Sequence, residues 1–378
     1  MKYARHTLAV FLLLGLGTQA ANLSAPEKNF EALWGTFNER YAFFKERKVD
    51  WQAQYKKFRP RVDSNTTDKE LFKTMCDMLA PLKDGHVTLW ARRLKLPEYC
   101  PEDLPRFTHE FNTRKLERQY KVMVQETLTA NGFGEPKTAG RILSYTHNEK
   151  FGYLLIREFD NVNRRKLDAA LDEALGAMDG IEGLIIDIRL NPGGTTGITY
   201  RIANRIANRV TYRVTYRIAN RFADKRRIGH HEKTRKAKNK AKGGKEFGPL
   251  RTFHVRPPAA NKKQRTFTGP IILLTHGASY SAADLFAMIM LELPHVKIIG
   301  EPTNGIFSNM LERKLPNGWK YTLSFQVNYT AKMVCLETKG VPVHVQVLNK
   351  RTDLKTGIDP LVTQALEMLT AKKVPQPK

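Results

Sequence analysis

Two apolar runs, each followed directly by a glycine-bearing turn, constrain the fold of this chain more than any other feature. Residues 183–190 (GLIIDIRL) lead into Asn191-Pro192-Gly193-Gly194, and residues 270–275 lead into a turn that contains Gly277 and Ser281. Continuous apolar runs of this length are typical of strands that are covered on both faces. Helical patterns over 163–178, 282–293 and 359–369 alternate with strand-like runs over 153–159 and 296–300. The alternation predicts an α/β fold built around a sheet.

Residues 21–90, which precede this core, are predicted to form a helical module. Ser24 with Glu27 and Thr67 with Glu70 have the spacing of capping boxes, and Asp50 can cap a helix between them. Apolar residues recur at helical spacing behind each cap, which predicts a module with its own core. Residues 91–150 are predicted to be a linker with irregular strands. Asn317-Gly318 lies between two strand-like runs and predicts a tight hairpin.

The first twenty residues have the three-part pattern of a secretory signal peptide. Lys2 and Arg5 precede an apolar run over residues 8–16, and Thr18-Gln19-Ala20 follows it. The run is shorter than a bilayer span, although an uncleaved N-terminal anchor is the alternative. We therefore expect an extracytoplasmic protein, either periplasmic or secreted.

Positive charge is concentrated in residues 201–245, which carry sixteen Lys and Arg against Asp224 and Glu232. Arginine recurs there every four residues from Arg201 to Arg221, so the side chains drift about 40° per step around a helix. We expect a helix that projects partly from the domain, followed by a solvated basic loop over 225–245. One interpretation is a tolerated insertion with no function, and the other is a surface that binds anionic polymers or lipid head groups.

The glycine-bearing turns are the candidate sites, because α/β proteins place their functional residues where strands end. Gly193 and Gly194 could let backbone amides approach an oxyanion, or they could simply form a tight turn. Ser281 begins a helical pattern, where a hydroxyl can be either a nucleophile or an ordinary N-cap. His86, beside a glycine in LKDGHVTLW, is the candidate base for such a nucleophile, although a lone histidine is more often structural.

Taken together, these segments resemble the carboxyl-terminal processing (tail-specific) proteases, especially their tricorn-core branch. The matching pieces occur in family order as LKDGHVTLW, FGYLLIREF, GLIIDIRLNPGG, TGPIILLTHGASYSAADLFA, VKIIGEPTNGIFS, LETKGVPV and GIDPLVTQAL. The resemblance implies a ClpP/crotonase-like α/β protease core over residues 151–378, with the basic insert at 201–245. Residues 91–150 are too short for the PDZ module that many relatives contain, so none is expected.

The resemblance also implies the roles of the site residues. Ser281 is the nucleophile, His86 the general base and Glu337 the carboxylate that completes the relay. Gly193 or Gly194, together with the amide of Ala282, forms the oxyanion hole. No metal or cofactor is implied, and the substrate is a peptide or protein. Three positions depart from the branch pattern, where Gly85 replaces a second serine, Asp284 a glutamate and His344 an aspartate.

The family's other branch uses a Ser–Lys dyad, and its lysine position is Ile306 in this chain. The expected function is therefore a secreted or periplasmic serine endopeptidase with a Ser-His-Glu relay. The alternative is a non-catalytic protein on the same scaffold, because similar folds in retinoid-binding proteins carry apolar ligands. A third interpretation is an anionic-surface binder that acts through residues 201–245.

Overall fold

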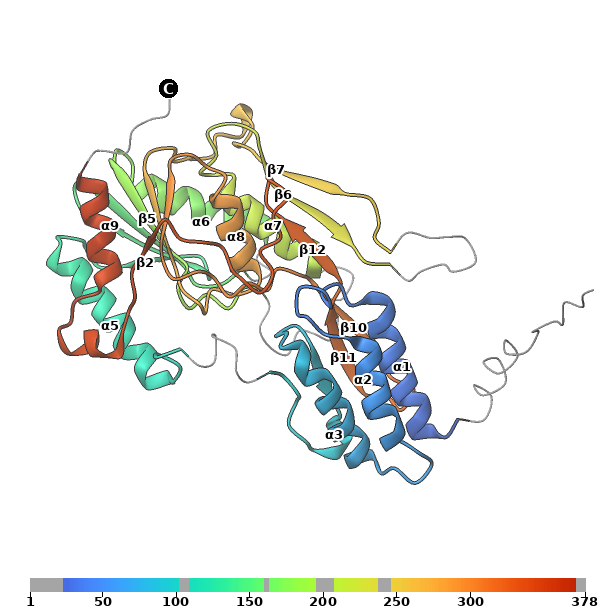
Figure 1. Ribbon diagram of the computed structural model, residues 1–378. Coiled ribbons are helices and arrows are strands. Elements are labelled where there is room, and N and C mark those ends of the chain that lie inside the picture. The colour runs from blue at the N-terminus through green and yellow to red at the C-terminus, as the bar shows by residue number, and fades with distance from the viewer. Residues whose placement is uncertain (1–22, 102–108, 160–162, 195–206, 237–245, 372–378) are drawn as a thin grey trace, which may run out of the picture.

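A seven-stranded sheet forms the centre of the computed structural model, which describes residues 23–101, 109–159, 163–194, 207–236 and 246–371 (Figure 1). The strand order is β13-β9-β8-β5-β4-β3-β2. The pairs from β13 to β4 are parallel, and β3 and β2 add antiparallel strands at one edge. In sheet order the strands span Val345–Gln346, Val296–Gly300, Ile271–Thr275, Gly183–Asp187, Phe151–Ile156, Leu143–His147 and Lys137–Ala139.

Helices cover both faces of this sheet, as expected for strands that are continuously apolar. One face packs against α6 (Arg164–Ala177), α7 (Ala207–Ala219) and α8 (Ala282–Met290). The other packs against α5 (Arg114–Ala130) and α9 (Pro360–Thr370), which lie together at one side of Figure 1. Every residue of α8 is buried, so this helix is fixed firmly beneath the turn that precedes it. The predicted α/β class is confirmed.

The N-terminal helices form where their caps predict. They are α1 (Ala25–Arg40), α2 (Trp51–Phe58) and α3 (Asp68–Leu79). Ser24 and Thr67 form capping boxes with Glu27 and Glu70, and the Asp50 side chain accepts a hydrogen bond from the Ala53 amide. Short 3-10 turns lie at Arg59–Arg61, Ala80–Leu82, Arg92–Leu94, Ala260–Lys262 and Arg351–Lys355.

The core of this helical module is shared with a distant part of the chain. The predicted Asn317-Gly318 hairpin joins β10 (Met310–Lys314) to β11 (Lys320–Ser324), and β11 also pairs with β1 (Thr88–Trp90). Trp319 and Tyr321 of the hairpin are buried among the module's aromatic residues. The module thus has a core separate from those of the main sheet, but the helices do not complete it by themselves. The hairpin and Val327 cover apolar surface that the helices leave.

Residues 91–150 differ from the linker that the sequence suggested. They contain the 17-residue helix α5 and the strands β2 and β3 of the main sheet. The sequence does contain features of this helix. Thr113 caps it, and Tyr120, Val124 and Leu128 recur every four residues on its buried side, but charged residues between them obscure the pattern.

The basic insert is integrated into the fold in its described part. Val214 and Ile218 of α7 are buried in the core. The segment after α7 forms β6 (Arg227–Thr234), which pairs with β7 (Arg251–Val255) and β12 (Gln326–Tyr329). The expectations of a projecting helix and a solvated loop are therefore wrong for residues 207–236. The described helix spans only about three repeats, so the drift of its apolar residues stays within one stripe.

Most arginines of this segment that the structure places form ion pairs with carboxylates of the same chain. Ion pairs join Arg217 to Asp168, Arg221 to Asp172, Arg227 to Asp224 and Arg235 to Glu246. The lysines at 238, 240 and 242 lie outside the described residues, as does the whole of the signal-like segment 1–20. Among the described helices, none is both long and apolar enough to cross a bilayer. Within the same residues, no disulfide joins Cys76 to Cys100.

Candidate active site

Three turns meet at the carboxyl edge of the parallel strands. They follow β5, β8 and β9, which are neighbours in the sheet. The Tyr280 amide, in the second turn, donates to the Asn191 carbonyl of the first at 3.0 Å. Asn304, in the third turn, donates from its backbone amide to Ser279 and from its side chain to Gly277. These three turns therefore form one hydrogen-bonded unit.

Ser281 is the accessible serine of this unit. It is half-buried at the N-terminus of α8 and adopts a φ of +59°, a backbone conformation that costs a non-glycine residue energy. Ser279, two residues earlier, is fully buried, and its hydroxyl donates to the Ile188 carbonyl at 2.9 Å. Strained residues held in place by their surroundings are typical of functional sites. Ser281 rather than Ser279 thus presents a hydroxyl that could react.

Gly193 lies directly against this serine. A Cβ built on Gly193 would stand 2.5 Å from the Tyr280 carbonyl oxygen and 2.9 Å from Ser281 Cβ, and its φ is +86°. The Gly193 amide donates to Asn191 Oδ1 at 2.8 Å, so it is already engaged. Within the described residues, the amides of Gly194 and Ala282 have no such acceptor. Gly193 therefore permits the close approach of the turns, whereas the amides of Gly194 and Ala282 are the ones left to donate to a ligand.

Asp284 fixes the nucleophile turn from within the protein. Its carboxylate accepts the Ser281 amide at 2.6 Å and the Gly305 amide at 2.7 Å, which joins the second turn to the third. The side chain is completely buried, and this burial raises the pKa of Asp284 to about 7 although the backbone donors oppose the shift. The sequence marked Asp284 only as a departure from the family pattern.

His86 belongs to the N-terminal module and lies beside the second of these turns. It precedes β1, and its carbonyl accepts a hydrogen bond from the hydroxyl of Thr322 in β11 at 2.7 Å. The imidazole is buried and meets the Tyr280 ring edge-on, with 5.3 Å between ring centroids. Tyr280 directly precedes Ser281 and also packs against Ile306. The structure thus places the predicted base against the residue that precedes the predicted nucleophile, although the two lie about 200 residues apart in sequence.

Glu337 reaches this region on the loop that follows β12. Its two carboxylate oxygens accept hydrogen bonds from Arg47 Nη2 at 2.9 Å and from the Phe307 amide at 3.0 Å. Arg47 also lies 3.7 Å from Asp84 Oδ2, which accepts the Tyr41 hydroxyl at 2.9 Å. One guanidinium therefore stands between two buried carboxylates near His86.

The surroundings shift the pKa values of these two carboxylates in opposite directions. Burial alone would raise the pKa of Asp84, but Arg47 and His86 outweigh it and hold that pKa below its ordinary value. Burial raises the pKa of Glu337 well above its ordinary range, and repulsion from Asp84 adds to the rise while Arg47 opposes it. Asp84 is thus the carboxylate that keeps its negative charge most readily beside the histidine.

The sequence did not identify Arg47, Tyr41 or Asp84 as site residues. Asp84 had a usable signal, because it stands two residues before His86 in the same motif and its Oδ1 accepts the His86 amide at 2.8 Å. Arg47 and Tyr41 had none, since they occur in a helical region where arginine and tyrosine are ordinary. Among the described residues there is no cluster of His, Cys, Asp and Glu that could hold a metal ion.

Comparison with family models supports this arrangement of segments. Residues 150–347 match the model described as peptidase family S41, and residues 25–80 match the tricorn protease C1 domain. The resemblance found in the sequence is thereby confirmed. A search of curated proteins gives no match.

Solved structures share the fold over most of the chain. A candidate peptidase from Parabacteroides merdae ATCC 43184 is 26% identical with a TM-score of 0.73, and the match covers 94% of this chain and 100% of that one. Mature CPAF is 11% identical with a TM-score of 0.61, covering 93% and 98%. The photosystem II D1 C-terminal processing protease is 14% identical with a TM-score of 0.50, covering 86% and 94%. The last two similarities concern the fold alone.

Proposed function

Because the chain belongs to peptidase family S41, we propose that it is a serine endopeptidase in which Ser281 is the nucleophile. The observation that carries the proposal is the placement of Ser281. Its hydroxyl is the accessible one on a strained turn, with the Gly193 turn on one side and the His86–Tyr280 contact on the other. Nucleophile, base and amide donors in one place are what acyl transfer requires.

In the proposed reaction, Ser281 Oγ attacks the peptide carbonyl carbon while His86 accepts the hydroxyl proton. The amides of Gly194 and Ala282 would stabilise the oxyanion, a contribution worth about a hundredfold or more in rate per donor. His86 then returns the proton to the leaving amine, and the acyl group stays on Ser281. Water, activated by the same imidazole, hydrolyses the ester and regenerates the serine.

In this scheme, one of the carboxylates around Arg47 would stabilise the positive charge of protonated His86. While His86 holds the proton it is a cation, and Asp84, whose pKa is held below its ordinary value, supplies a negative charge close to it. Burial favours the protonated form of Glu337, so Asp84 is the carboxylate that is charged when the imidazolium forms. This makes Asp84 a second candidate, beside Glu337, for the group that stabilises the imidazolium.

The proposal extends to the cellular location on sequence grounds. Lys2, Arg5 and the apolar run that follows favour export of the chain, so the endopeptidase would be periplasmic or secreted. Detection of a mature form that begins near residue 21 would support this location. A full-length chain retained in the cytoplasm would contradict it.

Labelling with a fluorophosphonate probe tests the nucleophile directly. Wild type is expected to label and to hydrolyse an unstructured protein such as casein, and Ser281→Ala is expected to do neither while keeping its circular dichroism and unfolding transition. Ser279→Ala is the matched control, and it should retain labelling because the Ser279 hydroxyl is hydrogen-bonded inside the turn.

The same probe tests the base, since His86→Ala should label at least about a hundredfold more slowly, the usual scale of general-base catalysis. A labelled, active Ser281→Ala protein would reject the assignment, and no labelling of wild type would favour a non-catalytic protein.

A further inference from the structure

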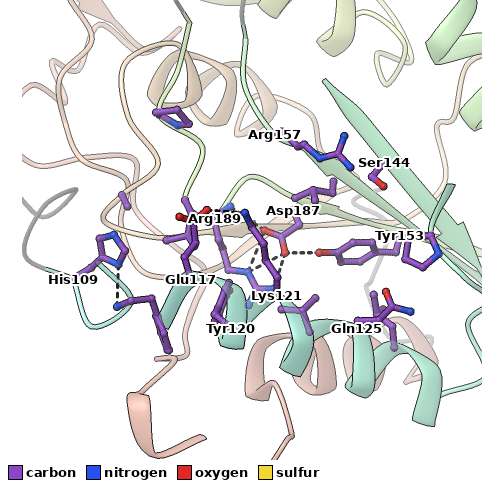
Figure 2. A pocket seen from close by; sticks show the side chains of 18 of the residues that line it. His109, Glu117, Tyr120, Lys121, Gln125, Ser144, Tyr153, Arg157, Asp187 and Arg189 are labelled. Atoms are coloured by element: carbon purple, nitrogen blue, oxygen red, sulfur yellow. Dashed lines mark hydrogen bonds and ion pairs between the residues drawn. The ribbon is translucent and has the colours of Figure 1, made fainter. Parts of the chain in front are cut away.

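A large cavity lies between α5 and the sheet, beside the site just described. Its volume is about 690 Å³, within the range of about 300–1,000 Å³ that is usual for ligand pockets. Figure 2 shows its wall formed on one side by α5 residues such as Tyr120 and Gln125 and on the other by sheet residues such as Tyr153 and Asp187. The helix that the sequence did not predict is thus one wall of this cavity.

The cavity extends to two of the three turns of the candidate site. Pro192 and Ala278 both line it. Pro192 directly precedes Gly193, which touches the Ser281 side chain, and Ala278 stands three residues before Ser281 in the nucleophile turn. A peptide whose carbonyl lies at Ser281 would therefore have its neighbouring residues next to the cavity.

The polar groups in the wall of the cavity are already satisfied by one another. Asp187 accepts the Tyr153 hydroxyl at 2.6 Å and forms an ion pair with Arg189, also at 2.6 Å. Arg189 forms a second ion pair with the buried Asp359 at 2.8 Å. Figure 2 shows the part of this network formed by Tyr153, Asp187 and Arg189. The two charged groups of this network that line the cavity, Asp187 and Arg189, are therefore paired with each other, and the buried Asp359 leaves the network one negative charge in excess, which disfavours an anionic ligand.

The rest of the lining is largely apolar and aromatic. Phe111, Tyr120, Val124, Leu128 and Leu155 are among the residues that form it. The one cationic side chain of the lining for which the described residues offer no carboxylate partner is Arg157, which is exposed to solvent. Apolar surface of this kind gains free energy by burying another apolar group.

We propose that this cavity is a substrate subsite, which receives a large aromatic or aliphatic side chain next to the scissile bond, and that α5 determines this preference. The inference rests on the proposed peptidase activity and adds to it a class of substrate. A peptide is the favoured occupant over a free apolar ligand because the cavity begins at the turns that surround Ser281.

Two tryptophan substitutions on α5 provide a matched test. Gln125 lines the cavity and is only partly buried, so Gln125→Trp should fill the cavity without disrupting the core. Val122 is 54% exposed on the same helix and does not line the cavity, so Val122→Trp is the control. Substrates are peptides that differ only by Phe, Leu, Ala or Asp at each position flanking the cleaved bond.

Wild type is expected to prefer Phe or Leu over Ala and Asp at one flanking position by about tenfold or more in kcat/KM. Gln125→Trp should reduce that preference at least about tenfold, and its rate of fluorophosphonate labelling reports whether Ser281 stays reactive. Val122→Trp should preserve both.

Three results would overturn the proposal. The first is an unchanged side-chain preference in Gln125→Trp. The second is an equal loss of kcat/KM for every peptide in that variant. The third is that Gln125→Trp loses the binding of a fluorescent fatty acid while peptide cleavage does not change. The last result would assign the cavity to an apolar ligand. If wild type neither labels nor cleaves, the proposed function itself fails, and labelling separates that failure from a wrong subsite.

Discussion

At the scale of single residues, Arg47 is the buried cation that lies beside both carboxylates of the candidate site, Asp84 and Glu337. Its side chain is 6% exposed, and the side chains of Asp84 and Glu337, which it contacts, are at most 1% exposed. Arg59 offers an instructive contrast, since it also pairs with two carboxylates, Glu27 and Glu31, but nearer the surface. Removing one partner of a buried ion pair leaves a buried charge without compensation, whereas a surface pair is replaced by water.

We therefore expect Arg47→Met to lower the free energy of unfolding by about 3–5 kcal/mol. The same substitution at Arg59 should cost only about 1 kcal/mol. Chemical denaturation of both variants measures the difference. Equal losses would mean that solvent reaches the Arg47 cluster.

Asp284 gives a pH dependence whose sign can be stated in advance. The carboxyl has an ordinary pKa of 3.8, and in the folded protein the pKa is raised to about 7. Between these two values the folded state holds a proton that the unfolded state has released. Linkage then requires that the stability contributed by this group is greatest below pH 4 and declines as the pH rises to about 7.

Asp284→Asn should remove this decline, because asparagine does not titrate. The test compares the free energy of unfolding of wild type and variant at several values from pH 4 to pH 8. The difference, wild type minus variant, is expected to fall with rising pH. A difference that is flat or that rises would show that Asp284 is ionised throughout.

At the scale of elements, the site depends on turns that pack backbone against backbone. Gly193 against the nucleophile turn is one such contact. In another, a Cβ built on Gly305 would lie 2.6 Å from the Gly340 amide nitrogen, so the third turn packs closely on the loop that carries Glu337. These glycines are therefore required for close approach and for their positive φ, not for flexibility alone.

Gly193→Ala tests this element directly against a control. Gly193 and Gly180 have nearly the same φ, +86° and +82°, but no atom lies within 4 Å of a Cβ built on Gly180. Gly180→Ala should cost only the left-handed strain, about 1–2 kcal/mol, and leave activity intact. Gly193→Ala should also lower kcat by at least about tenfold, because the Tyr280–Ser281 backbone must move. Equal activity in the two variants would show that the turn can shift without consequence.

At the scale of the whole molecule, the site joins parts of the chain that cannot be separated. His86 comes from the N-terminal module, Ser281 from the sheet core, and β11 connects the two through its pairing with β1. Trp319, at the start of β11, is 4% exposed and meets the Phe72 ring at 5.7 Å in an edge-to-face contact. The module and the core should therefore unfold together.

Trp319→Ala is expected to destabilise the protein by about 3–5 kcal/mol and to lower activity in parallel, because β11 fixes the backbone next to His86. Met333→Ala is the surface control, since Met333 is 44% exposed, and it should stay within about 0.5 kcal/mol. A single unfolding transition seen by both fluorescence and circular dichroism would support one cooperative unit. Two separate transitions would show that the module folds independently.

Much of this molecule was predictable because its determinants are local. Caps and apolar periodicity define α1, α2 and α3, and β9 spans the predicted residues 296–300. Ser281 and the glycines stand in motifs where adjacent residues specify a turn, and His86 stands in a motif that the family resemblance supplied.

What the sequence by itself determined was the helices with clear caps, the continuously apolar strands and the glycine-bearing turns, since backbone propensity and capping depend on neighbouring residues. The tertiary structure alone decided which of those segments meet. It buried Arg47 between Asp84 and Glu337, placed the hairpin on the N-terminal helices, and engaged the Gly193 amide with Asn191. It also turned α5, in a stretch that read as a linker, into the wall of a cavity. Burial and long-range electrostatics depend on residues hundreds of positions apart, and no local pattern encodes them.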